Sequence, residues 1–276
     1  MRGHAIHGTS IITSSCSIIT GLGTIDTSNG HTQYYLGVVP GSWRTFGTED
    51  DSFWCCNGTG TEEYSKLADS IYFRSADAVF VNLFIPSDLY WKERHIRLRQ
   101  TNQFPHEPRT HLEVIVDSPQ HFALNIRVPS WVSSFPAVSV NGKPLELSAG
   151  PGSYLVLARS WRNGDQIEVT LPMSVCARPM PDDPSQQAFL YGPLLLADIV
   201  GDRRVPEKLA IGLMGPEFKK HAPPPVPELH AVSADSNEWI RKRPESLTFD
   251  VPGSVTLVPF NSIGAGQLYS VYWKVS

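Results

Sequence analysis

Residues 52–73, SFWCCNGTGTEEYSKLADSIYF, combine two adjacent cysteines with the pattern of a short helix. After a turn of small residues, apolar positions recur at the spacing of one helix face: Tyr64, Leu67, Ala68, Ile71 and Tyr72. Thr59 and Glu62 stand three positions apart, as the N-cap and N3 residues of a capping box do. The sequence therefore predicts a helix over residues 61–73, with the cysteines just before its N-terminus.

Cys55 and Cys56 are neighbours in the chain, which limits their chemistry. Adjacent Cα atoms lie about 3.8 Å apart, whereas disulfides usually span about 4.4–6.8 Å, so a bond between them would be strained. The positive end of the helix favours the thiolate, which is the form that binds soft metals or acts as a nucleophile. The alternative, that both are small buried hydrophobic residues, stays open.

The longer stretch DSFWCCNGTGTEEYSKLADSIYF resembles the cysteine motif of glycoside hydrolase family 127, the beta-L-arabinofuranosidases, most specifically in its WCC-x-GTG-x-E string. The similarity continues in order through VFVNLFIPSDLYWKE, LYGPLLLA, TLVPF and YSVYWKV, so it extends from about residue 30 to the C-terminus. The resemblance implies the C-terminal remnant of an (α/α)6 barrel followed by two antiparallel β-sandwich domains.

The same resemblance implies roles for individual residues. Cys55 would be the nucleophile of a retaining glycoside hydrolase and a zinc ligand, and Cys56 a second zinc ligand. His31, Tyr35 and Trp43 would be substrate-binding residues in the wall of the sugar pocket, although Tyr35 and Trp43 could instead cover the end of the barrel. The implied cofactor is zinc, and the implied partners are plant-type glycans that contain arabinose.

Part of the implied site has no counterpart in this sequence. The resemblance calls for a catalytic Glu and two further zinc ligands, a Glu and a Cys, upstream of the cysteine pair, but residues 1–54 contain no matching Glu-x-Cys stretch. Cys16, in SSCSII, has a different context. We therefore expect the C-terminal part of such an enzyme, as a fragment, a truncated gene model or a decayed copy, and expect it to be inactive alone. The alternatives are a non-catalytic β-sandwich support or carbohydrate-binding module, and a structural zinc site formed by associating chains.

Composition narrows the class of protein. A hydrophobic content of 41% allows a real core. The net charge of −4, with both signs interspersed, argues against a nucleic-acid partner. The sequence contains no run of eighteen apolar residues, so no membrane span is expected. It has four cysteines, two of them adjacent, and this pattern is not that of a disulfide framework. The cellular location is not indicated.

The hydrophobic period changes after the predicted helix. From Ala78 onward, short runs alternate apolar and polar residues, which is typical of half-buried strands. Asn141-Gly142 is a strong hairpin signal between two such runs, and the proline-rich residues 179–184, MPDDP after Pro179, mark a break. We therefore predict a mainly β protein with the barrel end at 1–74 and sandwich domains at 75–178 and 179–276.

Overall fold

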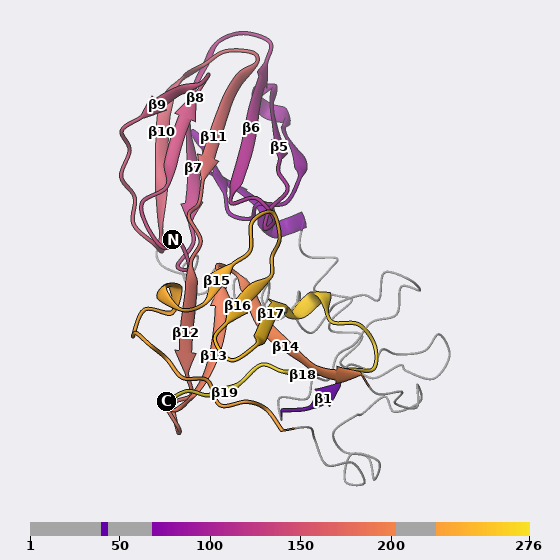
Figure 1. Ribbon diagram of the computed structural model, residues 1–276. Coiled ribbons are helices and arrows are strands. Elements are labelled where there is room, and N and C mark those ends of the chain that lie inside the picture. The colour runs from indigo at the N-terminus through magenta and orange to yellow at the C-terminus, as the bar shows by residue number, and fades with distance from the viewer. Residues whose placement is uncertain (1–39, 44–67, 203–224) are drawn as a thin grey trace, which may run out of the picture. The chain divides into compact units, whose positions relative to one another are not determined.

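The computed structural model describes residues 40–43, 68–202 and 225–276, and strands make up most of this part of the chain (Figure 1). Helix is confined there to one turn at residues 68–71 and to the short 3-10 helices η1 (Lys92–Arg94), η2 (Ser236–Glu238) and η3 (Phe260–Ser262). None of the helical segments in these ranges has the length and apolarity of a helix that crosses a bilayer. The prediction of a mainly β protein is confirmed.

The chain divides into two compact units. One is Ser65–Ser174, and the other contains Val175–Ser276 together with strand β1 (Ser42–Trp43). The division lies a few residues before the expected break at 178/179. The residues of 1–74 that the structure describes form β1, the helical turn and β2 (Tyr72–Arg74), and they show no remnant of a helical barrel.

The predicted helix over residues 61–73 is described only at its end. The turn at 68–71 is helical, but the chain is already a strand from Tyr72, because Tyr72 pairs with Val81 and Arg74 with Val79 in an antiparallel ladder. Pairing with a neighbouring strand overrides the helical spacing of Tyr72 in the sequence. The rest of the predicted helix lies outside the described residues.

The unit Ser65–Ser174 contains a four-stranded sheet in the order β10-β7-β3-β2. Its remaining strands are β3 (Ala78–Val81), β7 (Gln120–Val128) and β10 (Ser153–Trp161). The β3–β7 pairing is parallel, so the expectation of a purely antiparallel sandwich is wrong at this point. After β3 the chain runs through three strands of another sheet before it returns as β7, and such a crossover brings two strands together in parallel.

A six-stranded antiparallel sheet completes this unit, in the order β4-β5-β6-β11-β8-β9. Its strands are β4 (Ser87–Trp91), β5 (Ile96–Thr101), β6 (Arg109–Val116), β8 (Ala137–Val140), β9 (Lys143–Leu145) and β11 (Asp165–Thr170). The β8–β9 hairpin closes at Asn141 and Gly142, with φ of 52° and 74°. Both residues need positive φ in a tight two-residue turn, which is why Asn-Gly predicts this hairpin correctly.

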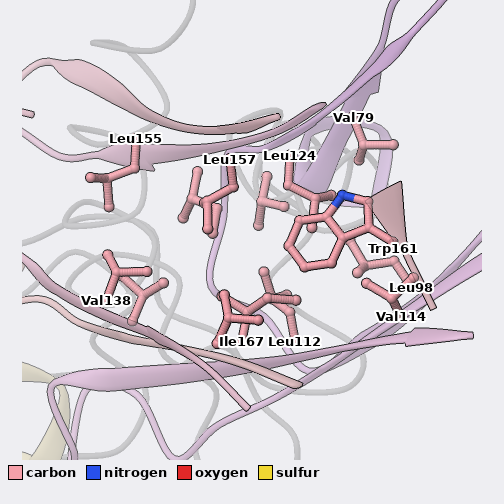
Figure 2. Packing of buried hydrophobic residues seen from close by; sticks show 14 of the residues in the cluster. Val79, Leu98, Leu112, Val114, Leu124, Val138, Leu155, Leu157, Trp161 and Ile167 are labelled. Carbon is pink, nitrogen blue, oxygen red and sulfur yellow. The ribbon is translucent and has the colours of Figure 1, made fainter. Parts of the chain in front are cut away.

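The two sheets of this unit pack face to face around one apolar core. Figure 2 shows facing side chains from the four-stranded sheet, Leu124, Leu155 and Leu157, and from the six-stranded sheet, Leu112, Val138 and Ile167. Trp161 fills the space between the sheets with no exposed surface, and its indole N–H donates a 3.0 Å hydrogen bond to the Phe122 carbonyl. Burying each large apolar side chain contributes about 1.5–3 kcal/mol, so this shared core holds the sheets together.

The C-terminal unit is built on a nine-stranded sheet with the path β1-β18-β14-β17-β16-β15, extended by β12, β13 and β19. These strands are β12 (Val175–Pro179), β13 (Gln186–Tyr191), β14 (Leu194–Asp202), β15 (Arg241–Lys242), β16 (Phe249–Val251), β17 (Val255–Pro259), β18 (Gln267–Ser270) and β19 (Trp273–Lys274). The predicted proline-rich break falls in the connection between β12 and β13, which pair as a hairpin. The main core of the C-terminal unit centres on Phe189. The centroid of its ring lies 5.5 Å from the ring centroid of Trp239 and 5.7 Å from that of Trp273.

Candidate functional site

Most of the predicted site residues lie outside the part of the chain that the structure describes. Cys55 and Cys56, the predicted nucleophile and zinc ligands, belong to residues 44–67, and the predicted pocket residues His31 and Tyr35 belong to residues 1–39. Their roles therefore stay predictions.

Trp43 is the one predicted pocket residue that is described. It lies in β1, which pairs antiparallel with β18, so that Trp43 is opposite Leu268 and Ser42 opposite Tyr269. The backbone N–H of Gly41 donates a 2.9 Å hydrogen bond to the Tyr269 carbonyl and fixes the start of the strand. With 6% of its surface exposed, Trp43 belongs to the buried interior of the C-terminal unit. Both predictions for Trp43, contact with sugar and covering the end of the barrel, stay predictions.

The described residues do not form a zinc site. Over residues 40–43, 68–202 and 225–276, no group of three His, Cys, Asp or Glu side chains is placed to hold a metal ion. Cys176 is a free, exposed cysteine in β12, and its thiol lies 3.5 Å from the carbonyl oxygen of Ala177. The described donor set thus does not fit zinc, and the two predicted ligands lie elsewhere in the sequence.

A polar cluster lies on the face of the four-stranded sheet that is turned away from the core. The hydroxyl of Tyr154 on β10 donates a 2.6 Å hydrogen bond to Oδ1 of Asn82, just after β3, and the Tyr154 ring meets the Phe80 ring edge-on at 5.6 Å. Arg127 on β7 is opposite Tyr154 and only 6% exposed. Burial raises the pKa of Tyr154 and lowers the pKa of Arg127. Tyr154 therefore stays a protonated hydrogen-bond donor at neutral pH.

The C-terminal unit contains a half-buried carboxyl at Asp198 in β14, between partners Leu257 and Ser270. Burial raises its pKa, and hydrogen bonds from the backbone N–H groups of Ile199 and Thr256 oppose that rise. A retaining glycosidase needs two carboxyl groups, or a carboxyl and another nucleophile, about 5 Å apart. Asp198 has no such partner among the described contacts, so it does not make a catalytic pair.

Sequence reasoning missed both of these features. Arg127 occupies a polar position of an alternating strand, which is typical of a solvent-facing side, whereas Asp198 follows the apolar run of residues 194–197 and was passed over as part of that strand. Their burial depends on tertiary contacts that leave no local signal in the sequence. Tyr154 could have been noticed only as an aromatic residue at a strand start.

Comparisons with known proteins identify the fold. Residues 78–173 match the family profile described as "Beta-L-arabinofuranosidase, GH127 middle domain". A GH127 beta-L-arabinofuranosidase from Geobacillus stearothermophilus T6 is similar in structure, with a TM-score of 0.68 and 15% identity over 98% of this chain and 46% of its own. A search of curated protein sequences finds no match.

Two further solved structures agree. A GH127 beta-arabinofuranosidase has a TM-score of 0.68 and 18% identity, over 98% of this chain and 46% of its own. A protein described as a glycoside hydrolase has a TM-score of 0.68 and 17% identity, over 98% of this chain and 49% of its own. The chain thus spans about half the length of the solved structures that it matches, and at these identities the likeness concerns the fold. Residues 78–173 thus match the middle domain of the GH127 beta-L-arabinofuranosidase family.

Proposed function

We propose that this chain is part of a retaining glycoside hydrolase of the beta-L-arabinofuranosidase type and that it does not turn over substrate by itself. The observation that carries the assignment is the match of residues 78–173 to the GH127 middle domain. The fold likeness across 98% of the chain supports the view that the C-terminal unit also belongs to this architecture. In this proposal residues 1–74 are the end of a catalytic (α/α)6 barrel, and residues 75–178 and 179–276 are two β-sandwich domains.

The proposed chemistry rests on the cysteine motif. In a retaining reaction a nucleophile attacks the anomeric carbon while an acid protonates the leaving oxygen, and the same acid group then activates water as a base. By resemblance Cys55 is the nucleophile, held as a thiolate at a helix N-terminus. The resemblance also makes Cys55 and Cys56 zinc ligands, and zinc, when bound, would hold the thiolate form.

The proposed lack of activity follows from the groups that the resemblance calls for but that have no counterpart in this sequence. A zinc site normally takes four ligands, and this sequence offers two, Cys55 and Cys56. General acid catalysis typically contributes about 10²–10⁴-fold, and the Glu that would provide it has no counterpart in the motif-matched residues. The proposed substrates of the complete enzyme are plant-type glycans that contain arabinose.

The second candidate is a non-catalytic support or carbohydrate-binding module. It is favoured by the description of the matched profile as a middle domain and by the two-sheet core that this chain forms over the same residues. Isothermal titration of the chain with arabinose oligosaccharides, beside a hydrolysis assay on the same preparation, separates the two. Binding with no turnover, unchanged by Cys55→Ser, supports a binding module. Turnover that depends on Cys55 supports a complete enzyme and contradicts the proposed inactivity.

A further inference from the structure

A small cleft opens in the unit Ser65–Ser174 where the edges of its two sheets come together. β2 is an edge strand of the four-stranded sheet and β4 an edge strand of the six-stranded sheet. The hydroxyl groups of Tyr72 on β2 and Ser87 on β4 are hydrogen bonded at 3.0 Å and link these edges. The cleft has a volume of about 250 Å³, and its lining residues are Arg74, Val79, Leu89, Tyr90, Trp91, Lys92 and Glu93.

Aromatic side chains form part of the cleft lining. Tyr90 is 59% exposed, although it sits in a strand whose neighbours Leu89 and Trp91 turn toward the core. The Arg97 guanidinium lies 5.0 Å from the centroid of the Tyr90 ring, a cation–π distance that holds the ring in place. Since a ring has two faces and Arg97 covers one, the exposed ring offers a rigid platform to a ligand.

Charged groups stand beside this platform. Arg74 donates two hydrogen bonds to the Glu93 carboxylate, at 2.9 and 2.8 Å, and Lys92 is exposed next to Glu93. The bidentate pair fixes both side chains and neutralises the charge of Arg74. An incoming anion would meet the Glu93 carboxylate, whereas a neutral hydroxyl group can donate to Glu93 and accept from Arg74 or Lys92.

We propose that this cleft binds one neutral sugar ring of a glycan, with the ring stacked on Tyr90 and its hydroxyl groups held by Arg74, Glu93 and Lys92. The volume of 250 Å³ lies below the range of about 300–1,000 Å³ typical of pockets for drug-sized ligands, which suits a single sugar ring. The site goes beyond the proposed hydrolase, because none of its residues belongs to the cysteine motif and binding requires no turnover, and it would give the second candidate, a carbohydrate-binding module, a defined binding site.

Saturation-transfer NMR on the whole chain tests this site, with methyl arabinofuranoside and methyl galactoside as neutral probes and galacturonate as the anionic probe. The neutral glycosides should receive saturation from the wild-type chain, and galacturonate should receive less. Tyr90→Ala should weaken binding by about tenfold, the loss of one stacking contact. The matched control is Phe135→Ala, which removes another exposed aromatic ring, 66% exposed, that does not line the cleft; it should leave binding unchanged.

Glu93→Gln keeps the size of the side chain and removes its charge. In a site for neutral sugars it should weaken binding of the glycosides, because their hydroxyl groups lose a charged hydrogen-bond acceptor. Equal saturation in wild type and Tyr90→Ala, or no saturation of either neutral glycoside by the wild-type chain, would overturn the proposal. Galacturonate binding that exceeds glycoside binding and increases in Glu93→Gln would show an anion site instead.

Discussion

The hydroxyl of Tyr154 donates a 2.6 Å hydrogen bond to the side-chain oxygen of Asn82, and this bond joins β10 to the end of β3 across the intervening β7. Asn82 is only 7% exposed. Its oxygen would therefore lose a buried partner if the hydroxyl were removed. Stability therefore comes from the outer face of this sheet in addition to the apolar core.

Tyr154→Phe should lower the free energy of unfolding by about 1–2 kcal/mol, because it leaves a buried acceptor without its donor. Urea denaturation followed by circular dichroism measures the change. Tyr90→Phe is the matched control, since it deletes the same hydroxyl from an exposed ring on β4, and it should change stability by less than about 0.5 kcal/mol. Equal effects of the two variants would mean that the Asn82 contact adds nothing.

Neighbouring residues of β10 test the register of the sandwich. Leu157 is 4% exposed and faces the core, whereas Val156 is 53% exposed on the other face. Leu157→Ala should cost about 2–5 kcal/mol through lost burial and the cavity that remains, and Val156→Ala about 0.5 kcal/mol or less. The same denaturation experiment compares the two variants. A larger loss of stability in Val156→Ala would show that Val156, and not Leu157, faces the core.

The β8–β9 turn depends on backbone conformation at Gly142. Its φ is 74°, and a Cβ added there would meet no atom within 4 Å, so Gly142→Ala tests backbone strain without a clash. The expected loss is about 1 kcal/mol. At Gly150 an added Cβ is equally free and φ is not in the left-handed region, so Gly150→Ala should be neutral or slightly stabilising. Thermal unfolding of both variants gives the comparison.

The pKa of Asp198 predicts a pH dependence of stability. Burial raises this pKa in the folded state above the ordinary value of 3.8, so the folded chain binds the proton more tightly than the unfolded chain. The Asp198 contribution to stability is therefore most favourable below the ordinary pKa and falls as the pH rises through the folded pKa. Asp198→Asn carries no charge, so its stability relative to wild type should increase between about pH 4 and pH 7. Urea titrations measure the free energy of unfolding of both proteins. If the difference between Asp198→Asn and wild type stays constant over this pH interval, the raised pKa of Asp198 is refuted.

The strands of this protein could be predicted from sequence where one face is buried and the other is not. Leu112, Val114 and Val116 alternate with partly exposed residues in β6, and Asn141-Gly142 marks the hairpin that the structure contains. Non-local pairing could not be predicted, because the parallel contact of β3 with β7 depends on a crossover through three other strands. The predicted helix ends earlier than expected for the same reason: Tyr72 pairs with Val81 in the sheet, and this contact is also non-local.

The candidate sites show a similar limit. The cysteine motif was recognised from residues that are adjacent in sequence. The cleft brings Arg74 on β2 close to Glu93 in η1, and the pairing arises only when the edges of two sheets meet. The alternation of apolar and polar residues along each strand indicated which side chains are exposed, but not which of them lie close together in the fold.

The central claim, that this chain is part of a beta-L-arabinofuranosidase and inactive by itself, is tested most directly by a hydrolysis assay. Purified 1–276 is incubated with zinc and p-nitrophenyl beta-L-arabinofuranoside, with Cys55→Ser as the matched control and a complete homologue as the positive control. We predict release of p-nitrophenol at the rate of the blank from both forms of this chain. Robust turnover by the wild-type chain that disappears in Cys55→Ser would contradict the account and show that residues 1–276 contain the whole catalytic apparatus.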